Sequence, residues 1–230
     1  MISRRTLDLV FSGGGVLLAV LLIAFGYLLA DQGSFARSYV RDQLGQQKIT
    51  FATADKLTPE DTSWKPGSTC LADNAGQPME TGKQAECYAN FYIGMHLVTR
   101  AEAAGFPGAT YATLGTTQSE LRSELAAANE KGDTAGAAKI QEQLDAATSL
   151  RSTMQTGETL RGLLLTSYGF SIFGEKAVLA STIAFIAAAL MVVLSVAGFV
   201  HAFLTPREKL VFGNVQLGVR GTSAEPTAGG

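Results

Sequence analysis

The stretch AVLASTIAFIAAALMVVLSVAGFVHAFL, residues 177–204, contains 28 residues, and His201 is its only titratable side chain. At about 1.5 Å of rise per residue it would form a helix of roughly 42 Å, against a bilayer hydrocarbon core of about 30 Å. Residues 9–30 form a second run of 22 residues without a charge, enough for a helix of roughly 33 Å. The sequence therefore predicts two transmembrane helices.

The first run follows Arg4 and Arg5, so a secretory signal peptide is the alternative interpretation. Its apolar part exceeds the roughly 7 to 15 residues usual for a signal, and Leu28 stands where a cleavage site needs a small residue. We expect an uncleaved anchor.

The two runs divide the chain into four parts of a mostly α-helical protein. Only 17% of its residues are charged, below the roughly 25% typical of soluble domains. The expected parts are an N-terminal tail and first span (1–30), a helical extracytoplasmic domain (31–176), a second span (177–204) and a cytoplasmic tail (205–230).

Lysine and arginine near the spans indicate the orientation, because these residues concentrate on the cytoplasmic side of a membrane. Arg4, Arg5, Arg207 and Lys209 favour a plasma-membrane protein with two passes and both termini in the cytoplasm. The signal is modest, since basic residues also flank the other side of the spans: Arg37, Arg41, Arg161 and Lys176.

The two cysteines of the chain, Cys70 and Cys87, both lie in the central domain. An even pair in an exported segment favours a disulfide, which would contribute on the order of 3 kcal/mol to stability. The alternative is two reduced, buried thiols in a cytosolic loop, which would invert the topology. A redox pair is disfavoured because the spacing is not C-x-x-C.

Helical periodicity organises the central domain. We expect the first span to continue for about four turns beyond the bilayer, and a helix over about 83–102 to begin at the capping box Thr81-Gly-Lys-Gln84. A second capping box, Thr117-Gln-Ser-Glu120, predicts an αα-hairpin of residues 119–130 and 135–154. Its expected apolar seam is Leu121, Leu125, Ala128, Ala138, Leu144, Ala147, Leu150 and Met154.

The stretch LLLTSYGFSIF, residues 163–173, is too short to span a bilayer and carries no charge. We expect an interfacial helix over 157–173 that turns into the second span at Gly174. Leu164, Tyr168 and Phe170 would then contact either lipid headgroups or the span of a partner protein.

Small residues recur at four-residue steps within both spans. Gly15 and Ala19 in the first, and Ala180, Ala184 and Ala188 in the second, would permit close helix packing in lipid. The two spans pack either on each other or on a foreign helix.

No pattern of catalytic or metal-binding residues stands out in the sequence. A site from Cys70, Cys87 and His96 is disfavoured because the thiols can bond to each other. His201 could ligate a haem only with a ligand from another chain. We therefore expect no enzyme activity, no cofactor and no nucleic-acid partner.

Several segments together resemble a known family: QKITF (47–51), TGKQA (81–85), YANFYIGMHL (88–97), GETLRGLLL (157–165) and GFVH (198–201). In this order, between two spans, they are similar to two-span actinobacterial membrane proteins. Members are labelled uncharacterised or, loosely, aromatic ring-opening dioxygenases, and at least one similar protein is an accessory component of the mycobacterial cytochrome bcc and cytochrome oxidase supercomplex. The αα-hairpin looks longer here than is typical of the family.

The resemblance implies an exported domain and association with respiratory complexes, with cytochrome bcc and oxidase subunits and membrane lipids as partners. The dioxygenase label does not fit, since one histidine in the central domain cannot build a site of two histidines and one carboxylate. The first hypothesis is a non-catalytic accessory subunit that supports assembly or stability. The alternatives are an envelope-anchored binding or scaffold protein unrelated to respiration, and an enzyme with an unrecognised site.

Overall fold

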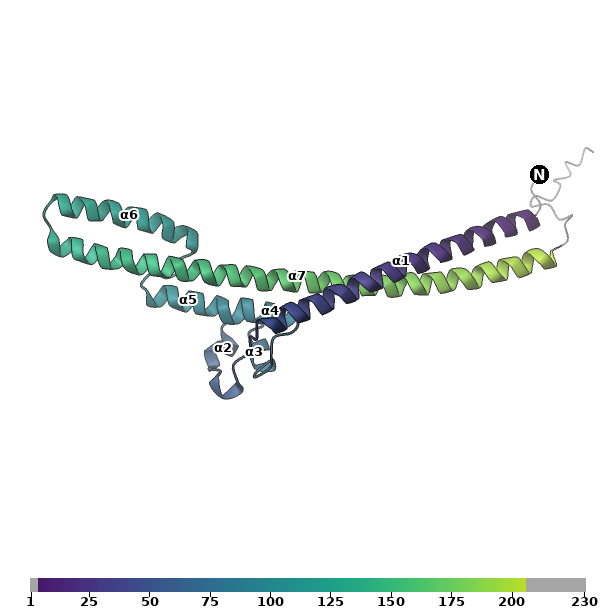
Figure 1. Ribbon diagram of the computed structural model, residues 1–230, viewed down its shortest axis with the longest axis horizontal. Coiled ribbons are helices and arrows are strands. Elements are labelled where there is room, and N and C mark those ends of the chain that lie inside the picture. Colours follow the sequence, from purple (N-terminus) through teal and green to yellow (C-terminus); the bar gives the residue numbers. More distant parts are fainter. Residues whose placement is uncertain (1–3, 206–230) are drawn as a thin grey trace, which may run out of the picture. The chain divides into compact units, whose positions relative to one another are not determined.

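The computed structural model describes residues 4–205, and these are mostly α-helical, as predicted (Figure 1). The C-terminal residues of the expected tail, including Arg207 and Lys209, lie outside the described range. The only β pairing in residues 4–205 is an isolated bridge between Thr50 and Pro78. The helices are α1 (Arg4–Gln46), η1 (Ala54–Lys56), α2 (Pro59–Ser63), α3 (Cys70–Asp73), α4 (Gly82–Cys87), η2 (Tyr88–Ile93), α5 (Gly94–Ala103), α6 (Tyr111–Glu130) and α7 (Thr134–Leu204).

The chain forms two compact units, which we call the terminal unit and the central unit. The described part of the terminal unit comprises residues 4–28 and 180–205, and the central unit comprises Leu29–Leu179. Helices α1 and α7 each contribute to both units. The predicted extension of the first helix beyond its apolar run is confirmed, because α1 continues to Gln46.

The terminal unit is an antiparallel pair formed by the first part of α1 and the last part of α7 (Figure 1). Small side chains line its seam. Ala19 is 1% exposed and Ala188 2%, and a β-carbon added at Gly15 would collide with the Ser195 hydroxyl. Such residues let two backbones approach closely, and dispersion then holds the helices together.

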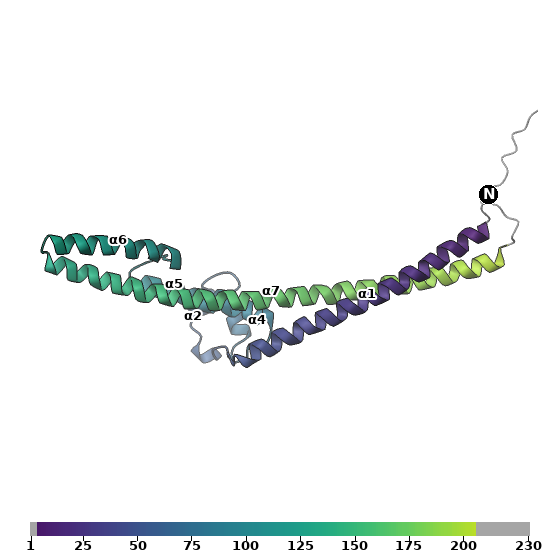
Figure 2. The same ribbon diagram turned by 45° about the horizontal axis from the view of Figure 1, so that its top comes forward.

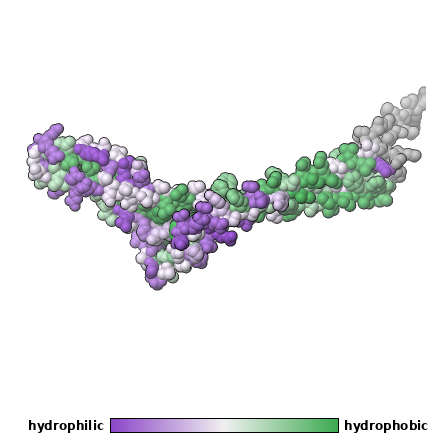
Figure 3. Space-filling model, viewed as in Figure 1, coloured by the Kyte–Doolittle hydropathy of each residue, from purple (hydrophilic) through white to green (hydrophobic). Residues whose placement is uncertain are grey.

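The outside of this helix pair is apolar, as Figure 3 shows for one face. In the most apolar 18-residue windows of α1 and α7, only 22% and 17% of the residues are buried. A core helix of a soluble protein would bury most of such a window. Both helices are thus long and apolar enough to cross a membrane, and their large apolar side chains are exposed where a span would meet lipid.

In the central unit, α1 and α7 pack closely at two glycines. A β-carbon added at Gly33 would lie 2.9 Å from the carbonyl oxygen of Gly174, and one added at Gly174 would lie 2.9 Å from the β-carbon of Ala36. Real β-carbons do not sit this close to such atoms, so both positions require glycine.

Helix α7 is unbroken over 71 residues, and this corrects three sequence-based expectations. The hairpin helix does not end at Met154, no separate interfacial helix spans 157–173, and Gly174 is not a hinge. Gly174, the predicted turn, and Gly157, the predicted start of the interfacial helix, lie at close packing contacts instead. Gly174 faces α1, and a β-carbon at Gly157 would lie 2.6 Å from a methyl carbon of Leu97.

The αα-hairpin consists of α6 and the first turns of α7, which lie side by side in both views (Figures 1 and 2). Helix α6 begins earlier than predicted, since the capping box that opens it joins Thr110 and Thr113. Thr117 lies inside the helix, where its hydroxyl donates to the carbonyl of Thr113 (3.1 Å). Most of the predicted seam is buried, but Leu125 is only half-buried, and Ala137 takes the place of Ala138, which is exposed.

A buried polar link joins the two helices of the hairpin. The side-chain amide of Gln118, 4% exposed, donates to the Thr148 hydroxyl over 2.8 Å. Arg151 donates to the carbonyl of Tyr111 (3.2 Å) and lies over its ring (4.2 Å to the centroid). These contacts set the register of a seam that is otherwise thin.

The close approach at Gly174 yields a test with opposite signs at two glycines of α7. In Gly174→Ala, the added methyl should cost about 1–3 kcal/mol of overpacking, which outweighs the helix-propensity gain of about 0.5–1 kcal/mol. Gly162→Ala has no atom within 4 Å of the added carbon, so it should stabilise. Thermal unfolding of both variants in detergent measures the difference. A Gly174→Ala protein as stable as Gly162→Ala would contradict the packing described.

Candidate functional site

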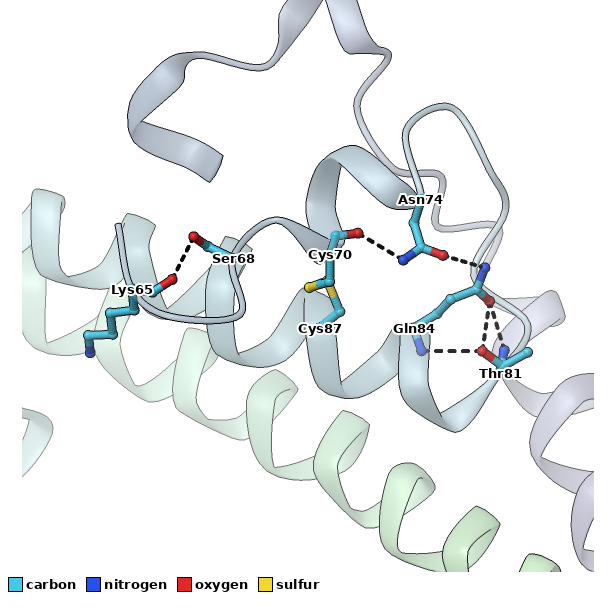
Figure 4. Close-up of a disulfide and its surroundings, with 7 residues drawn as sticks. All are labelled: Lys65, Ser68, Cys70, Asn74, Thr81, Gln84 and Cys87. Carbon is cyan, nitrogen blue, oxygen red and sulfur yellow. Dashed lines mark hydrogen bonds between the residues drawn. A yellow bond between two sulfur atoms is a disulfide. The ribbon is translucent and has the colours of Figure 1, made fainter. Parts of the chain in front are cut away.

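The cysteine pair links the short helices α3 and α4 of the central unit. Cys70 and Cys87 form the predicted disulfide, with their α-carbons 6.1 Å apart (Figure 4). It joins α3 to the last residue of α4. The capping box predicted at Thr81 and Gln84 is also present, and the Gln84 amide donates to the side chain of Asn74 (3.2 Å). Covalent and hydrogen-bonded links therefore fix the connector before α4.

Immediately after Cys87 the chain forms a π-helix, Tyr88–Ile93, where an uninterrupted α-helix was predicted. The amide of Gly94 donates to the carbonyl of Ala89, five residues back. Arg161 of α7 donates its Nε–H to the same carbonyl over 3.0 Å, and its Nη1 pairs with Glu158 at 2.8 Å. We call this arrangement the arginine clamp. Widened helical turns of this kind are frequent at functional sites.

Aromatic rings follow the clamp along one face of the helix. Phe51 meets Tyr88 edge to face with centroids 5.4 Å apart, and Tyr88 stacks on Tyr92 at 4.6 Å. Burial and the neighbouring Tyr92 raise the pKa of Tyr88 to about 12. His96 ends the row, exposed, with Nδ1 2.8 Å from the Tyr92 carbonyl oxygen. The row packs against the core, so these aromatics act as core residues.

A cavity of about 470 Å³ lies beside the clamp, with Trp64, Phe91 and Arg161 among its walls. Arg161 is already engaged by Ala89 and Glu158. Within residues 4–205, no three His, Cys, Asp or Glu side chains come together in a way that could hold a metal ion. The clamp joins α7 to η2 within the central unit.

The structure separates the residues predicted from LLLTSYGFSIF. Leu164 is 3% exposed and belongs to the core of the central unit, so it cannot contact a partner. Tyr168 is half-buried, and the nearby carboxylate of Glu86 raises its pKa. Phe170 is 49% exposed and lies beside Tyr39 of α1, with centroids 6.4 Å apart.

Phe170 lines one surface hollow together with Tyr39, Leu160 and Leu163. We call these four exposed side chains the aromatic face, together with the exposed Phe35, which stacks on Tyr39, and Phe173, three residues along α7 from Phe170. Phe35 stacks on Tyr39 at 5.7 Å, and Phe173 is 78% exposed. The α1 half escaped prediction, because Phe35 and Tyr39 resemble the core face of an amphipathic helix. Their period of four did signal a common face.

The predicted helix-packing residues divide in a similar way. Gly15, Ala19, Ala184 and Ala188 lie in the seam of the terminal unit, whereas Ala180 is exposed. Sequence reasoning missed the link between His201 and Asp8, which are 2.9 Å apart. Asp8 lies just outside the apolar run, and the residues around it give no indication of a contact with His201, which is distant in the sequence.

Comparisons with protein-family models, curated proteins and solved structures gave no match to this chain. The class defined by the coordinates is a helical domain carried on two helices that could cross a membrane.

The disulfide should dominate the stability of the central unit. Reduction should cost on the order of 3 kcal/mol, equivalent to a fall in melting temperature of about 10 °C for a unit of this size. Thermal unfolding with and without a reducing agent measures it, and Cys70→Ala/Cys87→Ala should melt at the lower temperature in both conditions. Wild-type protein that melts at the same temperature with and without the reductant would disprove this.

The arginine clamp makes a separate prediction. Arg161→Gln should destabilise the central unit by about 1–3 kcal/mol, because it removes a charged donor from a buried carbonyl. Hydrogen exchange at the amides of residues 88–94 should quicken in the variant. Arg122→Gln, an exposed change on α6, is the control and should alter neither quantity. Unchanged exchange in Arg161→Gln would show that the π-helix stands without the clamp.

Proposed function

We propose that this protein is a non-catalytic, membrane-anchored accessory subunit of a larger membrane complex. Its two apolar helices would span the plasma membrane, with both termini in the cytoplasm and the central unit outside. Following the family resemblance, the partner is an actinobacterial cytochrome bcc and cytochrome oxidase supercomplex, which the subunit would help to assemble or stabilise.

The observation that carries the proposal is the aromatic face. Six large apolar side chains of the central unit, on α1 and α7, are each at least 39% exposed. In the proposed placement Phe35 and Phe173, within five residues of the apolar runs, would lie at the depth of the lipid headgroups, and the other four would lie further out. Contiguous exposed apolar surface on a folded domain marks an interaction site. Phe and Tyr are also enriched in the anchoring positions of protein interfaces.

The disulfide supports the proposed orientation. Structural disulfides persist in exported domains and are rare in the cytosol, where thiols are kept reduced. Because the central unit lies between the two spans, an exported central unit would place both termini in the cytoplasm. Arg4 and Arg5, at the free end of α1, agree with that direction.

The motifs that carry the resemblance also support a shared architecture. The arginine clamp connects the segment 88–97 to the segment 157–165 through Arg161 and Ala89. Residues that contact each other in one core explain why the two segments would occur together. This contact supports the shared architecture of the domain. The identity of the partner is proposed from the resemblance alone.

Purification in mild detergent tests the proposal. A tagged copy expressed in an actinobacterium should recover haem absorbance and oxidase subunits. Phe170→Arg/Leu163→Arg should lose both while remaining in the membrane fraction, because charge on the aromatic face opposes an apolar contact. Val98→Arg, at a position 38% exposed on α5, is the control for Phe170→Arg alone, which adds the same single charge, and should recover the complex.

Wild-type protein recovered without haem or oxidase subunits would refute the respiratory assignment. Recovery of another membrane protein instead, lost in the aromatic-face variant, would favour the envelope scaffold. Equal losses in the Val98→Arg control would show that the aromatic face has no special role.

A further inference from the structure

A groove of about 710 Å³ opens in the central unit between α1, the start of α4 and α7. Three basic side chains, Arg37, Arg41 and Lys83, line it and are exposed. The ion pairs among residues 4–205 are Arg161 with Glu158 and His201 with Asp8, so none of the three cations forms a salt bridge there. We call this feature the boundary groove.

The groove begins where the apolar runs end. Ala30 is the last residue of the first run and Val178 is near the start of the second, and both line the groove. Arg37 lies seven residues beyond Ala30, about 10 Å further along the helix. The headgroup zone on each side of a bilayer is about 5–8 Å deep. Long basic side chains can lean back toward it, so Arg37 would reach the depth of lipid phosphates. Arg41 lies four residues, or about 6 Å, further out on α1, where it would contact the outer side of a headgroup.

Basic residues beside a span are common, so Arg37 and Arg41 on their own would not indicate a binding site. Here the third cation comes from a different element, since Lys83 opens α4. A β-carbon at Gly82 would lie 3.1 Å from the α-carbon of Tyr168 and would collide with the Ser171 hydroxyl. The tight packing of α4 on α7 is what carries Lys83 to the groove.

The lining also selects the kind of headgroup. Two carboxylates, Glu80 and Glu175, share the groove with the three cations, which leaves one net positive charge. A phosphodiester with no ammonium group matches this balance. The volume is within the range of about 300–1,000 Å³ for small-molecule sites, and apolar Ala30 and Val178 provide an exit for acyl chains.

We propose that the boundary groove binds the phosphate headgroup of an anionic phospholipid such as phosphatidylglycerol. This inference rests on the membrane placement in the proposed function, and it does not depend on the identity of the protein partner. Arg37 and Arg41 hold the phosphate from α1, Lys83 holds it from α4, and the acyl chains leave past Ala30 and Val178.

Native mass spectrometry of the delipidated full-length protein in detergent tests this proposal, with phosphatidylglycerol and phosphatidylcholine titrated separately. Wild type should retain phosphatidylglycerol at a lipid concentration at least about tenfold lower than phosphatidylcholine, since each basic group near a lipid surface contributes appreciably. Arg37→Gln/Arg41→Gln/Lys83→Gln should lose this preference. Arg100→Gln/Arg122→Gln/Lys139→Gln removes the same number and types of charge elsewhere and should keep it.

Lys83→Gln alone should reduce the preference for phosphatidylglycerol several-fold and leaves α1 unchanged. This single variant can therefore test the proposal if the triple variant folds poorly. Millimolar inorganic phosphate should not displace the bound lipid. Displacement by phosphate, an equal loss in the control variant, or no preference in wild type would each overturn the proposal. A protein that prefers phosphatidylglycerol yet recovers no haem refutes only the respiratory assignment, and the converse result refutes only the lipid site.

Discussion

The close contact of α1 with α7 is the constraint on which the other features depend. In each unit the two helices meet through residues with little or no side chain, such as Ala19 and Ala188 in one and Gly33 and Gly174 in the other. Because the inward faces carry small residues, the bulky apolar ones are left outside. The small residues on the contacting faces of α1 and α7 therefore account for the tight packing. They also leave the bulky side chains for the apolar exterior of the terminal unit and for the aromatic face of the central unit.

The central unit adds a second layer of constraint on this helix pair. Helices α4, η2 and α5 contact α7 at three heights, through Gly82 against Ser171, Ala89 against Arg161 and Leu97 against Gly157. At each of these positions along α7, a side chain contacts either a glycine or a backbone carbonyl. These contacts hold the domain in one register along α7.

The sequence predicted features governed by local chemistry. Two uninterrupted apolar runs, a unique cysteine pair and the Thr81–Gln84 capping box each carry their signal within a few residues, and each is present in the structure. Features decided by distant contacts escaped. Gly174 looked like a hinge and Gly157 like the start of a new helix, because glycine has low helix propensity, but both pack closely against residues of other helices. The Arg161 clamp and the assembly of the aromatic face likewise join segments far apart in sequence.

The cysteine content has a consequence for how the domain matures. With two cysteines in the whole chain, only one intramolecular pairing exists, so oxidation cannot trap a wrong isomer. Such a protein needs an oxidant in its compartment but no isomerase to correct its bonds. Disulfide formation in the central unit would then keep pace with the supply of oxidant, even in an envelope with little capacity for disulfide repair.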